Sequence, residues 1–175
     1  MKPYFSILSC AIALLLLPLG LLAQLRLPHF FSDHMVLQRN NNVKIWGWAH
    51  ADAKIAVVGS WQQDTIRTTT DSNGAWSVHI PTKDAGGPYT LSIHAKEQKI
   101  ELQDILLGDV ILCSGQSNME WGGNQNLKEI MDELPRATNP NIRLLQVSRI
   151  GTAYPQADIA DRWATLSAES LKPFS

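Results

Sequence analysis

The sequence is poor in cysteine and has no excess charge of either sign. Its 175 residues contain two cysteines, and 15 Lys and Arg residues stand against 16 Asp and Glu residues. A near-neutral chain that is 45% hydrophobic has neither the basic surface of a nucleic-acid-binding protein nor the composition of a disordered tail. We therefore expect no nucleic-acid partner. The length suits one compact domain, or a small domain and part of another.

Histidine is absent after residue 94, and no Asp is followed by a His three positions later. The five histidines are His29, His34, His50, His79 and His94. None of them has zinc-ligand spacing beside cysteines, so we expect no metal site, and no other cofactor is indicated. Chemistry near the end of the chain would therefore lack a local imidazole.

Residues 1–23 form a separate segment. Lys2 supplies a positive start, Phe5–Leu17 is almost wholly apolar, and Ala23 offers a small residue for cleavage. This pattern predicts a secretory signal peptide cleaved near Ala23, with export to the periplasm or the medium and no membrane contact afterwards. The alternative is an uncleaved membrane anchor, because the apolar run approaches spanning length. Pro18 and Gly20 near the end of the run favour cleavage.

Cleavage would leave Cys113 as the one cysteine, so no internal disulfide is expected. Cys10 precedes most of the apolar run, which argues against lipidation at that position. Cys113 ends a short apolar run, and we expect it to be a core residue rather than a reactive thiol.

Residues 24–104 predict a small antiparallel β-sandwich. Apolar and polar residues alternate at 76–80 and 89–94, which is typical of strands with one side facing solvent. Turn residues such as those at 71–74 separate the candidates, and this regular spacing favours a sandwich. Further candidate strands are Val43–Trp48, Lys54–Trp61, Thr65–Thr70 and Lys99–Leu102.

Four tryptophans of this region have two interpretations. They could form a surface on which sugars stack, or they could fill the core of the sandwich, which is the commoner use of such residues. The four are Trp46, Trp48, Trp61 and Trp76.

A different pattern begins at Gly108. The apolar run Val110–Cys113 predicts a short strand buried on both faces, as in a parallel sheet. Gly115 suits a tight turn after it, which would place Ser117 at the carboxyl edge of a sheet, where open α/β folds bind ligands. Ser117 is then a candidate nucleophile, which requires a base and oxyanion donors. The alternative is a serine that caps the following turn.

The string Gly115-Gln116-Ser117-Asn118-Met119-Glu120-Trp121 resembles the first sequence block of the sialate O-acetylesterase family, which belongs to the SGNH (GDSL-like) hydrolases. The resemblance extends, in the family's order, through residues 35–39, 45–49, 73–76 and 87–91. It implies that Ser117 is the catalytic serine and that its own backbone N–H is one oxyanion donor. It also makes Gln116 and Asn118 candidate substrate contacts. The family's base, a histidine in a late Asp-x-x-His pair, and its remaining oxyanion residues have no match in this sequence.

The period changes again after Ser117. Apolar residues at 127, 130, 131 and 134 predict a short amphipathic helix, with Asn126 as its N-cap and Pro135 as its stop. Asn141–Val147 predicts a second strand, so the order implies a parallel βαβ crossover. The predicted fold class is β + α/β: a small antiparallel β-sandwich (24–104) followed by the beginning of a parallel three-layer α/β SGNH hydrolase domain (105–175), truncated.

The resemblance implies a secreted serine esterase that hydrolyses acetyl esters on sugars, with an O-acetylated sialic acid or related glycan as its partner. Because no base follows Ser117, we expect these 175 residues to be an amino-terminal portion with little activity by itself. A histidine of the β region, such as His29 or His34, acting as the base is an alternative that the family's topology does not support. The other hypothesis is a non-catalytic secreted β-sandwich that binds glycans, or a truncated product. No oligomeric state is predicted.

Overall fold

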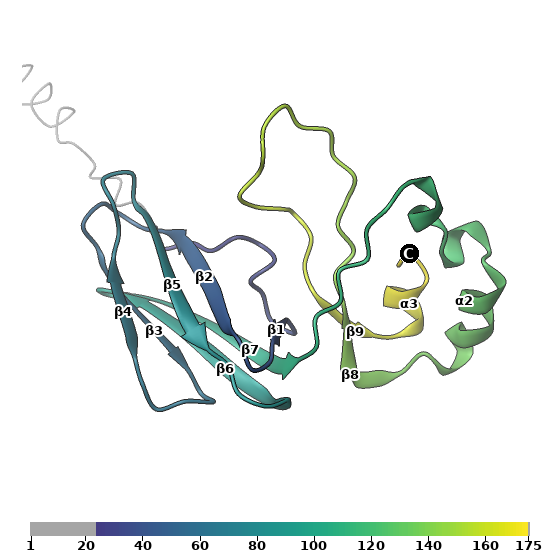
Figure 1. Ribbon diagram of the computed structural model, residues 1–175, viewed down its shortest axis with the longest axis horizontal. Coiled ribbons are helices and arrows are strands. Elements are labelled where there is room, and N and C mark those ends of the chain that lie inside the picture. The colour runs from purple at the N-terminus through teal and green to yellow at the C-terminus, as the bar shows by residue number, and fades with distance from the viewer. Residues whose placement is uncertain (1–23, 175) are drawn as a thin grey trace, which may run out of the picture.

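The computed structural model describes residues 24–174, so the predicted signal peptide lies outside the described residues. Figure 1 shows a lobe of strands, residues 24–108, beside a lobe with short helices, residues 109–174. We call them the β lobe and the cleft lobe. Within the described residues, no helix is long and apolar enough to cross a membrane. The structure is dominated by sheet.

The β lobe consists of a five-stranded sheet, in the order β1-β7-β6-β3-β4, and a two-stranded ribbon of β2 and β5. β7 is parallel to β1 and antiparallel to β6, so the sheet is mixed rather than wholly antiparallel. β7 also continues past residue 104, where the sequence placed the end of the first domain. The strands are β1 (Val36–Gln38), β2 (Asn42–Trp48), β3 (Lys54–Gly59), β4 (Ile66–Thr69), β5 (Ala75–Pro81), β6 (Gly86–Ala95) and β7 (Gln98–Gly108).

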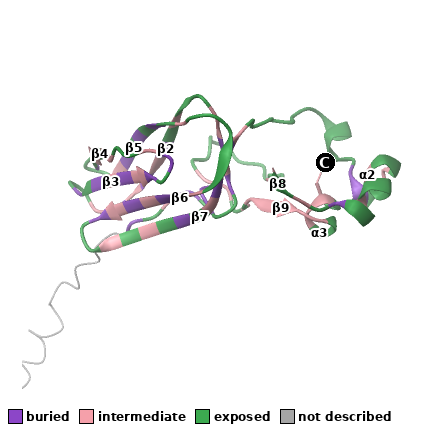
Figure 2. Ribbon diagram, turned by 90° about the horizontal axis from the view of Figure 1, so that it is seen from below, coloured by how far each residue is buried: buried purple, intermediate pink, exposed green. Residues whose placement is uncertain are grey.

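One hydrophobic core lies between the sheet and the ribbon. In β5, Trp76, Val78 and Ile80 are buried while Ser77 and His79 are exposed, as the period-two pattern predicts. Side chains of the sheet complete this core, among them Ile55, Val57, Leu91, Ile93 and Ile105. Figure 2 shows that the buried residues are concentrated in the β lobe, whereas the cleft lobe is mostly exposed. Stability therefore resides chiefly in the β lobe.

The four tryptophans of the β lobe are used in packing. Trp61 and Trp76 are buried in the core, and Trp46 packs against it beside two phenylalanines. Trp48 lies beneath the guanidinium of Arg26, whose central carbon is 3.9 Å from the ring centroid. These contacts favour the core interpretation over an open sugar-stacking surface.

The cleft lobe is built from short elements. β8 and β9 form an antiparallel pair, and Trp163, just before β9, packs against the core of the β lobe. This contact joins the two lobes. The elements are η1 (Ser117–Glu120), η2 (Gly123–Gln125), α2 (Lys128–Glu133), η3 (Leu134–Arg136), β8 (Asn139–Leu144), β9 (Ala164–Leu166) and α3 (Ala168–Leu171).

The strand predicted at Val110–Cys113 does not form. Ile111 and Leu112 are 82% and 87% exposed, and Cys113 is an exposed free thiol rather than a core residue. The reason is the lack of a partner: among residues 24–174 no strand pairs with this segment, so its backbone gains no ladder hydrogen bonds. Because β8 pairs with β9, the predicted parallel βαβ crossover is also absent from the described part of the chain.

The helix predicted after Ser117 forms, but its cap differs. α2 begins at Lys128 with Leu127 at the N-cap position. Asn126 instead ends η2 in the left-handed conformation, with φ of 58°. An asparagine tolerates this conformation better than most residues, because its short side chain can hydrogen-bond locally. It therefore ends one helical turn rather than starting the next.

Candidate functional site

The predicted catalytic serine lies on the wall of an open cleft of about 670 Å³. The first wall is the extended segment Ile111–Ser117, which leaves the end of β7, and the second wall is Leu145–Ile150, which leaves the end of β8. Phe174 also lines the cleft. Two segments far apart in the sequence thus meet around Ser117.

Ser117 is the first residue of η1 and is exposed. Gln116 holds the N-cap position in an extended conformation, without a side-chain capping bond, and its carbonyl accepts a hydrogen bond from the Met119 N–H at 2.9 Å. Within residues 24–174 the Ser117 hydroxyl makes no hydrogen bond, so the turn-capping alternative has no support in the structure. The hydroxyl is free to meet a ligand.

Gly115 acts through its small size rather than its backbone freedom. Among the described glycines a left-handed φ occurs at Gly74 and Gly87, not at Gly115. A Cβ at Gly115 would lie 2.8 Å from Cγ of Met119. A glycine is therefore needed at position 115 because the Met119 side chain of η1 packs closely against it, and not because of a special turn conformation.

The two candidate substrate contacts, Gln116 and Asn118, differ in their position relative to the cleft. Both are exposed. Gln116 lines the cleft beside Ser117. Asn118 is not among the cleft-lining residues, and its carbonyl accepts a hydrogen bond from the Trp121 N–H at 3.3 Å.

One ion pair stands at the cleft. Arg149, from the second wall, forms an ion pair with Glu120, with its Nη1 2.6 Å from Oε1, and both side chains are largely exposed. Exposed pairs of this kind contribute only about 0–1 kcal/mol. Arg149 can therefore exchange Glu120 for a carboxylate on a ligand at little cost.

No histidine among residues 24–174 lines the cleft. His29 contacts Asp158, with its Nδ1 2.8 Å from Oδ2, and His34 contacts Asp104, with its Nδ1 2.6 Å from Oδ2. Neither alternative base is therefore placed at Ser117. The described residues also contain no group of three or more His, Cys, Asp or Glu side chains that could hold a metal ion.

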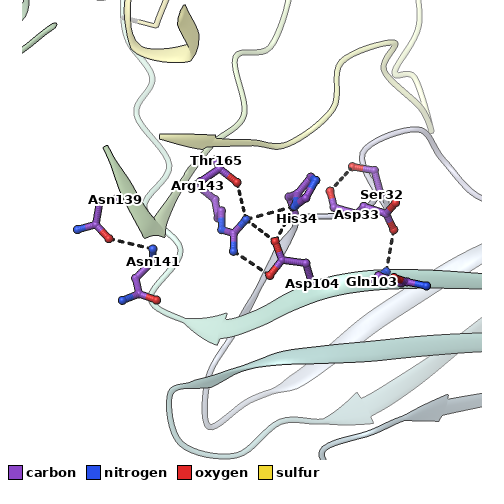
Figure 3. A network of polar contacts seen from close by, with 9 residues as sticks. All are labelled: Ser32, Asp33, His34, Gln103, Asp104, Asn139, Asn141, Arg143 and Thr165. Atoms are coloured by element: carbon purple, nitrogen blue, oxygen red, sulfur yellow. Dashed lines mark hydrogen bonds and ion pairs between the residues drawn. The ribbon is translucent and has the colours of Figure 1, made fainter. Parts of the chain in front are cut away.

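The structure reveals an ion-pair network that sequence reasoning did not find. Arg143 of β8 donates from Nη1 and Nη2 to the two carboxylate oxygens of Asp104 in β7, at 2.8 and 3.0 Å. Figure 3 shows Arg143 between Asp104 and Thr165, with His34 on the same carboxylate. The hydrogen bonds from Arg143 hold the pKa of Asp104 below its usual range. The partners are 39 residues apart, so no local spacing could have signalled them.

A second ion pair lies at the start of the first wall. Arg39 Nε donates to Oδ1 of Asp109 at 2.9 Å, and this hydrogen bond lowers the pKa of the Asp109 carboxyl. The Val110 N–H donates to Oε1 of Gln38, also at 2.9 Å. Both contacts tie the first wall to the end of β1.

Comparison with known proteins gives two kinds of match, while no family model matches the chain. Sialate O-acetylesterases from Homo sapiens and Mus musculus are 29% and 27% identical to it over 83% of its length. The chain spans 30% of the human protein and 29% of the mouse protein. A carbohydrate acetylesterase from Xanthomonas citri superposes with a TM-score of 0.79 and 30% identity, over 86% of this chain and 34% of that one.

Proposed function

We propose that this chain, a member of the sialate O-acetylesterase family, carries the nucleophile of a carbohydrate O-acetylesterase. The observation that supports this most directly is the exposed Ser117 on the wall of an open cleft, with a hydroxyl that has no hydrogen-bond partner in the described residues. The similar proteins are named as acetylesterases of sialate or carbohydrate. Their names and the free hydroxyl point to the same chemistry.

In the proposed reaction Ser117 Oγ attacks the carbonyl carbon of an acetyl ester on a sugar. The C–O bond to the sugar breaks, and the sugar oxygen leaves with a proton. Water then attacks the acetyl-serine, releasing acetate and regenerating the hydroxyl. The backbone N–H of Ser117 is the oxyanion donor that this chain supplies in the proposal.

The proton acceptor is the missing part. No histidine in the described residues lines the cleft. The proposal therefore assigns the base and the remaining oxyanion donors to residues beyond this sequence. Those residues would belong to an SGNH-type α/β domain of which residues 105–175 are the first part. The β-sandwich (24–104) precedes it, and the signal peptide (1–23) directs export. By itself the chain is expected to be almost inactive.

A sialic acid or another acidic sugar is the substrate that we favour. Arg149 lines the cleft with Ser117, and its guanidinium, which carries five N–H donors, is held by Glu120 only through an exposed ion pair. A guanidinium binds a carboxylate with charge-assisted hydrogen bonds. In the proposal Gln116, which lines the cleft next to Ser117, contacts a sugar hydroxyl or amide. Asn118 has weaker support because it does not line the cleft.

The test is acetyl release from an O-acetylated sugar by the full-length protein. Ser117→Ala is expected to abolish turnover and labelling by a serine-directed phosphonate. Ser114→Ala is the matched control, because Ser114 is an exposed serine of the same wall. Robust serine-dependent turnover by the 175-residue chain would overturn the view that the base lies elsewhere. Glycan binding that survives Ser117→Ala, without phosphonate labelling, would support the non-catalytic binding module instead.

A further inference from the structure

Both walls of the cleft are tied to the β lobe close to where they begin. The chain leaves β7 after Gly108, and the two residues that lead into the first wall, Asp109 and Val110, are held by Arg39 and Gln38 at the end of β1. The backbone N–H of Arg39 also donates a hydrogen bond to the Gly108 carbonyl at 2.9 Å. The first wall therefore starts from a backbone position fixed by the sheet.

The second wall starts two residues after Arg143. The side chain of Arg143 is only 3% exposed, and its guanidinium binds the Asp104 carboxylate with two parallel hydrogen bonds. Nη1 also donates to Oγ1 of Thr165 in β9 at 2.6 Å. A partly buried, two-point contact of this kind fixes direction as well as distance. Within the second wall and its strand, Arg143 is the side chain that reaches the β lobe through an ion pair.

The β lobe holds Asp104 in an unusual backbone conformation. Asp104 and His34 have φ of 54° and 67°, in the left-handed region that few non-glycine residues adopt. The His34 N–H donates to the Gln103 carbonyl at 3.2 Å, and the Gln103 N–H donates to Oδ1 of Asp33 at 2.7 Å. Figure 3 shows the contact between Asp33 and Gln103 on the β-lobe side of the Arg143 guanidinium. Strained conformations persist where the surroundings enforce them, and here they direct Asp104 toward Arg143.

We propose that Arg143 is a positioning residue: through Asp104 it fixes the second wall of the cleft relative to the wall that carries Ser117. Asp104 and Asp109, five residues apart along one chain segment, then anchor the two walls. The catalytic consequence rests on the proposed function, whereas the positioning itself does not. Lysine cannot replace Arg143, because an ammonium is a point charge without the planar fork that binds both carboxylate oxygens.

The test compares Arg143→Lys with Arg136→Lys. Arg136 also forms a bidentate pair, with Glu133, but it is exposed and lies within the cleft lobe. In Arg143→Lys we expect backbone amides of 144–150 to exchange at least about tenfold faster, while amides of β3 and β6 keep their protection. Arg136→Lys should leave the exchange of these amides unchanged.

Chemical rescue separates positioning from general destabilisation. In Arg143→Ala, millimolar ethylguanidinium is expected to restore slow exchange at 144–150, because it can occupy the site opposite Asp104. Unchanged exchange in Arg143→Lys, or faster exchange spread over β3 and β6 that ethylguanidinium does not reverse, would refute the proposal.

A catalytic measurement then connects the positioning to the reaction. In the full-length protein, Arg143→Lys should lower kcat for acetyl release about 100-fold while KM changes much less. If the wild-type protein shows no serine-dependent turnover, the proposed function fails, and hydrogen exchange still decides the positioning independently.

Discussion

Gly122 lies directly against the backbone of Phe174: a Cβ at Gly122 would stand 2.4 Å from the Phe174 carbonyl oxygen. The neighbouring Asn124 N–H donates to the Lys172 carbonyl at 3.1 Å. Phe174 in turn lines the cleft that contains Ser117. A glycine without a side chain thus lets the end of the described chain pack beside the segment that follows the candidate nucleophile.

We predict that Gly122→Ala destabilises the cleft lobe by about 1–3 kcal/mol, because the added methyl group displaces a backbone carbonyl rather than a flexible side chain. Urea unfolding followed by hydrogen exchange of residues 168–173 measures this. Gly151→Ala is the matched control, since nothing lies within 4 Å of a Cβ there. Equal stability of the two variants would contradict the close contact.

Cys113 gives a direct check of the first wall. Because its thiol is exposed, we expect it to react with a thiol reagent in the native protein within minutes, at the rate of an exposed cysteine in a peptide. A thiol buried in a strand would react only after unfolding. Protection of Cys113 in the native chain would show that Val110–Cys113 is covered, as the sequence alone predicted.

The sequence predicted the β lobe better than the cleft lobe, and the reason is physical. The strands of the β lobe bury one face against a core that lies wholly within residues 24–108, so alternation of the kind seen at Trp76, Val78 and Ile80 identifies them. The apolar run at Val110–Cys113 carries an equally clear signal. Its burial would require neighbouring strands, and none of the described strands pairs with it.

The candidate site was only partly predictable. The position of Ser117 came from a short string of residues, and the structure places it on a cleft wall. The second wall, Arg149 and the Arg143–Asp104 pair depend on contacts between residues distant in the sequence, for which one sequence carries no local pattern. Asp104 also gave no turn signal, although its backbone is left-handed.

The position of Arg149 in the cleft leads us to predict that the full-length protein prefers acidic sugars. If its guanidinium binds the sugar carboxylate, Arg149→Gln should lower kcat/KM for an acidic O-acetylated sugar about tenfold or more, since hydrogen bonds to charged groups contribute about 1.5–3 kcal/mol. Turnover of a neutral acetylated sugar by the full-length protein should change little. Arg162→Gln, an exposed arginine outside the cleft, is the control. A parallel loss on both sugars would argue against carboxylate recognition.

The Arg143–Asp104 pair predicts how stability responds to acid. Hydrogen bonds from Arg143 lower the pKa of Asp104 from its ordinary value of 3.8, so the unfolded chain binds the proton more readily than the folded chain. The stabilisation is therefore fully present above the ordinary value, and it is lost as the pH falls through the lower pKa of the folded state.

We expect the free energy of unfolding of the wild type to fall more steeply below pH 4 than that of Asp104→Asn, which cannot titrate at this position. Asp64→Asn, at an exposed carboxylate that makes no ion pair in the described residues, is the matched control variant. Urea unfolding between pH 2 and pH 7 provides the comparison. Identical slopes for Asp104→Asn and the wild type would mean that Arg143 does not favour the ionised carboxylate. The contact between the lobes would then lack the charge-assisted hydrogen bonds on which the positioning of the second wall depends.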